Sequence, residues 1–238
     1  MDRRALVERA NVIVTRVDPR AALTVGNGQT AFTADVTGLQ TLNSTYISPP
    51  LQMQTHADFG WHTTPPPTGV NPLRFKETAV VARNHSALYP VTQTGQAAEW
   101  AWLRANPHRL SLLRLFLRRS SGVPIAAADV QSIRQTLHLW NGTLASSFVL
   151  DGARVSVTTA VHPSRDALGV RVCSAAVRSK TLGLGLAFPY GSESFKGEGG
   201  WDSSDRHSST LVSGGGPCDA RPVVRHTLDT LTLTLTMP

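Results

Sequence analysis

Two short segments combine tryptophan with histidine and other polar side chains. The first is 58–62, with the sequence DFGWH, and the second is 100–108, with the sequence WAWLRANPH. Sugars present apolar C–H faces surrounded by hydroxyl groups, so a site for them needs aromatic side chains with a few placed polar groups alongside. Both segments have that composition. The candidate carbohydrate-binding residues are Trp61, His62, Trp102, Arg104, Asn106 and His108.

The same tryptophans also have a purely structural interpretation. Large aromatic side chains are often buried as anchors, with the indole N–H satisfied by a nearby acceptor. Trp61 and Trp102 would then close the ends of a β-sandwich and bind nothing. The sequence leaves both interpretations open.

Acidic residues and histidines are the other candidates for catalytic or metal-binding groups. Glycoside hydrolysis needs two carboxyl groups about 5–9.5 Å apart, a separation that sequence does not reveal. We expect most carboxylates here to be solvated or to lie in turns, so no catalytic residue is predicted. The eight histidines have no compact metal-ligand spacing, and Gly-x-Ser-x-Gly is absent. No metal and no cofactor is therefore expected. The acidic residues are Asp35, Asp58, Glu77, Glu99, Asp129, Glu193, Glu198, Asp202 and Asp205.

The elements that would position these residues are mainly strands. Asn141-Gly142 and Asp151-Gly152 favour tight hairpin turns, because both dipeptides tolerate positive φ angles. The flanking runs alternate apolar with polar residues, which predicts an antiparallel meander. These runs are 133–140, 143–150, 153–162 and 167–174. Cys173 lies in the last of them and is expected to be buried.

Further strands are predicted at both ends of the chain, and one helix between them. The strands are 12–17, 31–36, 182–188 and 231–236, and the helix is 96–105, stopped by Pro107. Residues 109–118 fit either a bulged strand or a helix face, and 126–132 fit a short helical turn. Without βαβ alternation, the fold class is all-β, an antiparallel sandwich with few short helices. The long loops 48–72 and 191–217 are expected to be functional or ordered.

Composition excludes several classes of partner. The 238 residues have a formal net charge of +7, but the basic residues are scattered rather than grouped. A nucleic-acid footprint would gather them on one face or along one helix, so no nucleic-acid partner is predicted. No apolar run reaches membrane length, and no apolar segment of a secretory leader follows the first residues. No membrane partner is therefore expected, and the compartment is not indicated.

An ordered series of motifs resembles the opening of six-hairpin glycosidase-like proteins. The Gly26-Asn27-Gly28 turn is shared more widely among glycosidases that begin with a β-supersandwich domain. The likeness covers nearly the whole chain. Each motif alone is weak evidence for the family, but the order in which the motifs follow one another is fairly specific to it. The matching segments are 4–7, 15–19, 23–28, 31–41, 59–62, 102–110, 135–137, 139–140, 162–163 and 188–190. The stretches 48–53 and 192–200 depart from the pattern.

The resemblance implies a division of labour. Proteins of this group pair a front supersandwich with a following (α/α)6 barrel that carries the catalytic carboxylates. This chain shows no series of helical hairpins, so the resemblance implies a front domain without its barrel. Loops of such a domain can pack on the barrel and help to line the sugar cleft. The six candidate residues named above are those expected in the cleft or at the interface with the barrel.

The sequence thus predicts one supersandwich domain over 1–238, cut short at its C-terminal end. Its expected function is to scaffold the barrel of a glycoside hydrolase and line part of the carbohydrate cleft, without hydrolysing anything alone. A stand-alone carbohydrate-binding module, a structural interaction domain and a complete small enzyme are the alternatives. A missing barrel also predicts an exposed apolar patch, because interfaces between domains bury roughly 600–1,500 Å².

Overall fold

The computed structural model describes residues 2–46, 53–191, 203, 205–214, 221–228 and 231–236. Two compact units are formed by these residues. Unit 1 consists of Met1–Gly60 and Ser111–Pro189, and unit 2 of Trp61–Leu110 and Tyr190–Pro238. All strand pairs in the described part of the chain are antiparallel. The predicted all-β, antiparallel, sandwich-like fold with few short helices is confirmed.

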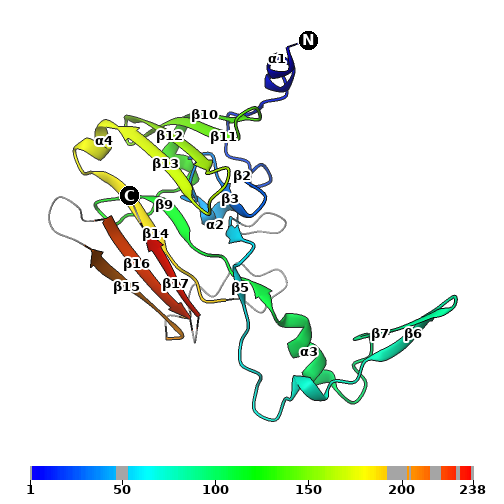
Figure 1. Cartoon of the computed structure of the whole chain (residues 1–238). Helices are drawn as coiled ribbons and strands as arrows, with labels where there is room; N and C mark the ends of the chain where they lie inside the picture. Colours follow the sequence, from blue (N-terminus) through cyan, green and yellow to red (C-terminus); the bar gives the residue numbers. More distant parts are fainter. Residues whose placement is uncertain are drawn as a thin grey trace. The chain divides into compact units, whose positions relative to one another are not determined.

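The largest sheet of unit 1 is the predicted meander with one added strand. Its five strands run in the order β1-β10-β11-β12-β13. Figure 1 labels the four neighbouring strands β10, β11, β12 and β13. Along β11 every second side chain is buried, which is the alternation that predicted the strand. The strands are β1 (Val12–Val14), β10 (Val130–His138), β11 (Thr143–Leu150), β12 (Ala153–Val161) and β13 (Leu168–Ser174).

The two predicted hairpin turns differ from each other. Asp151 and Gly152 have φ angles of 50° and 76° and form the expected two-residue loop between β11 and β12. The prediction of the same turn at Asn141-Gly142 is wrong. Strand β10 already ends at His138, and Gly142 closes a longer loop by donating its N–H to the carbonyl of His138. In that loop Asn141 accepts from Thr143 N–H through its side chain, which favours a wider turn.

A second layer of shorter strands covers the meander. Strand β2 contacts β11 and β12, strand β3 contacts β12, and the core of unit 1 lies between these strands. Phe32 from β3 and Phe148 from β11 are fully buried there. The shorter strands are β2 (Leu23–Gly26), β3 (Thr30–Ala34), β4 (Thr55–Ala57), β9 (Arg114–Arg119) and β14 (Leu182–Ala187), with β9 paired to β14.

The buried segment 35–42, which follows β3, is hydrogen-bonded within itself and to the strands of the meander. The carboxylate of Asp35 accepts hydrogen bonds from the Thr37 N–H and hydroxyl and from the Leu42 N–H. Gln135 from β10 donates to the Asp35 carbonyl at 2.6 Å, and Thr159 from β12 donates to the Gly38 carbonyl at 2.7 Å. Buried polar groups need such partners, so this segment is specified by hydrogen bonds as well as by apolar packing.

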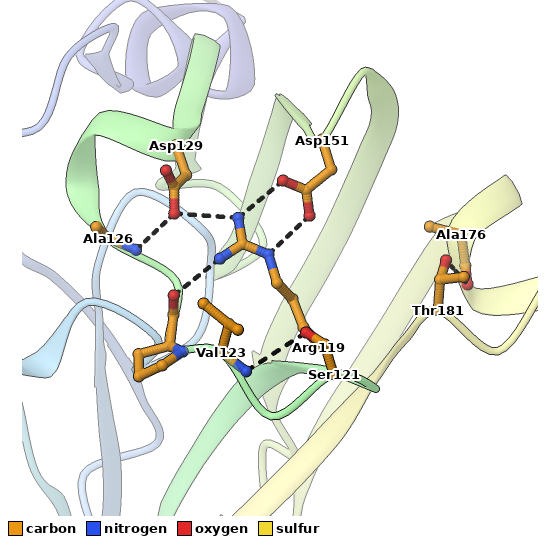
Figure 2. A network of polar contacts seen from close by, with 9 residues as sticks. Arg119, Ser121, Val123, Ala126, Asp129, Asp151, Ala176 and Thr181 are labelled. Atoms are coloured by element: carbon orange, nitrogen blue, oxygen red, sulfur yellow. Dashed lines mark hydrogen bonds and ion pairs between the residues drawn. The ribbon is translucent and has the colours of Figure 1, made fainter.

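Arg119, at the end of β9, joins three parts of unit 1 (Figure 2). Its guanidinium makes two 2.8 Å hydrogen bonds to the Asp151 carboxylate, one of 3.0 Å to Asp129 and one of 2.8 Å to the Pro124 carbonyl. The planar fork of arginine suits such paired contacts. Asp129 belongs to η2 (Ala127–Asp129), which is the predicted short helical turn.

Three details of unit 1 differ from prediction. Cys173 is exposed, not buried, because the outer face of β13 is open to solvent. The second cysteine of the sequence, Cys218, lies outside the described residues. Strand β1 ends at Val14 rather than at residue 17. Of the ambiguous stretch 109–118, Arg109 and the part from Arg114 onward are strand. The remaining helices are α1 (Arg3–Glu8), α2 (Asn43–Tyr46) and α4 (Ala175–Arg178).

Unit 2 holds the candidate site residues. The predicted helix is confirmed as α3, and the hairpin β6–β7 was not predicted. Strands β15, β16 and β17 form an antiparallel sheet of three, and the last of them was predicted. The elements are β5 (Trp61–His62), η1 (Pro72–Arg74), β6 (Thr78–Ala82), β7 (His85–Tyr89), α3 (Ala97–Ala105), β8 (His108–Arg109), β15 (His207–Gly214), β16 (Arg221–Leu228) and β17 (Leu231–Thr236). Within the described residues, no helix is long and apolar enough to cross a bilayer.

Candidate carbohydrate-binding site

The two segments that sequence singled out pair with each other. Strands β5 and β8 form a short antiparallel ladder in which Trp61 is opposite Arg109 and His62 is opposite His108. Side chains directly opposite each other lie on the same side of an antiparallel pair. The ladder therefore places a tryptophan and an arginine on one face and two histidines on the other.

The outer face of this ladder carries an aromatic platform. Trp61 is 45% exposed, and the guanidinium carbon of Arg109 lies 5.2 Å from the centre of its ring. Such stacking holds the arginine beside the indole, with its N–H groups available at the edge. An apolar ring flanked by hydrogen-bond donors has the composition that a sugar face requires.

The inner face of the ladder carries a hydrogen-bonded histidine pair. His62 is only 4% exposed, and its Nδ1 lies 3.0 Å from Nε2 of His108. The Nδ1 of His108 faces the Ala105 carbonyl at 3.2 Å, and a carbonyl can only accept. His108 Nδ1 therefore carries a proton, and with both rings neutral the His108 Nε2 accepts and the His62 Nδ1 donates. This chain of bonds orients both imidazoles.

Tyr190 and Gly191 pack beneath the histidine pair. The ring of buried Tyr190 meets the His62 ring edge-on, with 5.0 Å between centres. Arg206 donates a 2.6 Å hydrogen bond to the Tyr190 hydroxyl, and its guanidinium lies 3.9 Å from the centre of the tyrosine ring. Gly191 has no side chain, which leaves room for both imidazoles. Packing from 190–191 thus holds the inner face of the ladder.

A second set of contacts fixes the ladder to the end of α3. The side-chain oxygen of Asn106 accepts from the Thr64 N–H at 2.9 Å and from the Thr64 hydroxyl at 3.1 Å. Its amide donates to the Trp102 carbonyl, and the Trp102 indole donates to the Thr64 carbonyl, both at 3.1 Å. The polar groups of Trp102 and Asn106 are thus used inside the chain, where they hold Thr64, three residues after Trp61.

Helix α3 presents a second tryptophan–arginine pair. The guanidinium carbon of Arg104 lies 5.0 Å from the ring centre of Trp100, one helical turn earlier. The two side chains line a small pocket of about 150 Å³ together with Pro90 and Leu103. Trp100 was not among the predicted residues. Its spacing of four from Arg104 on a predicted helix was the signal that would have revealed it.

Each of these two pairs contributes one arginine to the surface. Neither Arg104 nor Arg109 forms an ion pair with any residue that the structure describes. The acidic residues considered as catalytic candidates are placed as follows. Asp35 is buried in unit 1, and Asp129 forms an ion pair with Arg119. Glu193, Glu198 and Asp202 lie outside the described residues. The described part of the chain also contains no cluster of three or more histidine, cysteine or acidic residues that could hold a metal ion. The arrangement is suited to binding a polar ligand with an apolar face.

Of the predicted residues, Trp61 and Arg104 are exposed beside other aromatic or basic groups. His62 and Asn106 are buried, Trp102 and His108 are half-buried, and all four are hydrogen-bonded within the chain. A scan against protein-family models found no match to this chain, and a search of curated proteins found no relative.

Proposed function

We propose that this chain is a non-catalytic domain of a glycoside hydrolase, in which it scaffolds a helical barrel and lines part of the sugar cleft. The proposal rests on the ordered motifs that resemble six-hairpin glycosidase-like proteins and on the composition of the β5–β8 ladder. The ligand class is carbohydrate, and the partner is the (α/α)6 barrel of the same polypeptide.

The observation that carries the proposal is the contrast between the two faces of this ladder. Trp61 is left exposed although its neighbour His62 is buried and hydrogen-bonded. Burying an indole stabilises a fold, so an exposed indole on a firmly held strand favours a role in recognition. Arg109 adds directed donors at the edge of the ring.

The test is made in the polypeptide that joins this chain to its barrel. Trp61→Ala should raise KM for an oligosaccharide roughly tenfold, because a stacked aromatic platform contributes about 1–2 kcal/mol, and leave kcat nearly unchanged. Trp140→Ala is the matched control, since Trp140 is equally exposed but lies in the β10–β11 loop of unit 1. Unchanged KM in the Trp61 variant with folding intact would favour a purely structural domain.

A stand-alone carbohydrate-binding module is the second candidate. It is favoured by the Trp100–Arg104 pair, which lines its own pocket without help from another domain. A self-sufficient module binds oligosaccharides as the isolated chain, whereas a cleft-lining domain needs its barrel. Calorimetric titration of the 238-residue chain against a glycan panel separates the two. Turnover of any glycan by this chain would instead indicate a complete small enzyme.

A further inference from the structure

The hairpin β6–β7 leaves apolar side chains exposed on both of its faces. Val80 is on one face, and Val81 and Leu88 are on the other, where they are 72% and 63% exposed. An isolated two-stranded hairpin is at best marginally stable in water, because it buries too little apolar surface. We therefore expect the hairpin to acquire a further strand or layer from a partner.

Among the residues that the structure describes, no strand pairs with the outer edge of β6, and this edge has none of the features that normally block strand addition. Its sequence is Thr-Ala-Val-Val-Ala, without charge, proline or glycine. Natural edge strands are usually protected by lysine, proline, bulges or inward-pointing charges. Strand β7, in contrast, is followed directly by Pro90. The free edge of β6 is consequently the better place for a new strand to pair.

Backbone geometry fixes which residues of β6 face this edge. Arg83 and Asn84 form a two-residue loop, so Ala82 and His85 are a hydrogen-bonded pair at the turn. Hydrogen-bonding direction alternates along a strand. Ala79 and Val81 therefore turn their N–H and C=O groups to the free edge, while Val80 bonds toward β7.

We propose that this edge pairs with the same edge of a second copy of the chain, antiparallel and about a two-fold axis at Val80. In this register Ala79 is opposite Val81 of the second copy, and both residues offer outward backbone groups. The two Val80 residues form the non-hydrogen-bonded pair at the axis, where side chains approach most closely. The result is a four-stranded sheet made from two hairpins.

Charges at the two ends of β6 match this register. Glu77 precedes the strand and Arg83 follows it, and both are exposed. They are six residues apart, roughly 20 Å along a strand, so they do not meet within one chain. Neither forms an ion pair with a described residue. About the Val80 axis, Glu77 of each copy lies next to Arg83 of the other, which gives two complementary pairs.

The test uses the full chain in sedimentation equilibrium with amide hydrogen exchange. The wild type should form a dimer as its concentration rises, and the Ala79 and Val81 amides should become protected in parallel. Glu77→Arg alone or Arg83→Glu alone should weaken the dimer roughly tenfold, since like charges then face each other twice. The double variant with both changes should restore wild-type affinity.

Arg154→Glu is the control, because it makes the same change of charge on an exposed position of β12. It should leave the dimer unchanged. A chain that stays monomeric at every concentration, or that pairs only with a helical barrel, would contradict the proposal. So would a dimer in which Ala79 and Val81 still exchange freely, or a double variant that associates no better than the single ones.

Discussion

Gly191 lies so close to His62 that any side chain at this position would collide with the imidazole. A Cβ atom on Gly191 would sit 2.5 Å from Nδ1 of His62, and equally close to Nε2 of His108. These are the two atoms that share the hydrogen bond on the inner face of the β5–β8 ladder. The hydrogen bond between the two histidines therefore requires glycine at position 191.

Gly191→Ala should separate the two imidazoles and destabilise unit 2. We expect a loss of roughly 1–3 kcal/mol in the free energy of unfolding, the usual range for overpacking. Gly183→Ala is the matched control, because Gly183 lies in β14 with no atom near its Cβ position. Urea unfolding of both variants checks this prediction. Equal stability of the two variants would show that the histidine pair is not closely packed against 191.

Gly38→Ala should lower the free energy of unfolding by more than the positive φ angle of residue 38 alone explains. Gly38 has φ +78°, and an added Cβ would lie 2.9 Å from Oγ of buried Ser146 and 3.1 Å from Val157. Gly122 has a similar φ of +80° but open space around its Cβ. We expect Gly122→Ala to lose about 1–2 kcal/mol and Gly38→Ala about 1–3 kcal/mol more. Equal losses in thermal unfolding would contradict this account.

Stability should depend on the ionisation of Asp35. Burial raises its pKa from 3.8 to about 6, although hydrogen bonds from Thr37 and Leu42 act in the opposite direction. The native state therefore holds this proton to higher pH than the unfolded chain, so stability falls as pH rises from about 4 to 6, by an amount on the order of 3 kcal/mol.

Asp35→Asn should remove this decrease of stability with rising pH, because asparagine does not titrate. It should also lower stability overall, because the NH₂ group of the new asparagine would face the Leu42 N–H, and two donors cannot bond to each other. Unfolding free energies at pH 4, 5, 6 and 7 for both proteins check this. A variant whose stability has the same dependence on pH as the wild type would show that Asp35 does not titrate in this range.

Arg119→Lys should affect two carboxylates differently. The Asp151 pKa is lowered chiefly by the hydrogen bonds from Arg119, whereas that of Asp129 is lowered first by the Ala126 N–H and then by Arg119. Lysine cannot reproduce the two-pronged contact. Carboxyl NMR titration should show the Asp151 pKa rising nearer its ordinary value and a smaller rise for Asp129.

A depressed carboxylate pKa contributes stability above the ordinary pKa, and this stability is lost as pH falls through the lowered one. The variant should therefore lose less stability on acidification than the wild type. An unchanged Asp151 titration would contradict the dominant role of Arg119.

Much of unit 1 was predictable because its strands alternate regularly and its turns are marked by particular residues. Asp151-Gly152 takes the positive φ angles that its residue types tolerate, and β11 buries every second side chain. Cys173 was misplaced because an apolar run does not reveal whether a second layer covers it. Asn141-Gly142 was misread because the Asn141 side chain bonds to its own loop and widens it.

The site was predictable in composition but not in arrangement. Sequence singled out Trp61 and His108 but gave no sign that β5 and β8 pair, because each strand is only two residues long. The partners of His62 at 190–191 are far away in the chain, and only packing brings them together. Arg109 was missed for the same reason, since its importance depends on facing Trp61 across the ladder.

The most direct test asks whether sugar touches Trp61. The protein that carries this chain with its barrel would be labelled with 5-fluorotryptophan, and its ¹⁹F resonances followed while an oligosaccharide is added to saturation. The account predicts a saturable shift of the Trp61 resonance and none for Trp140, which lies in unit 1. Saturation of the enzyme with the Trp61 resonance unmoved would contradict it.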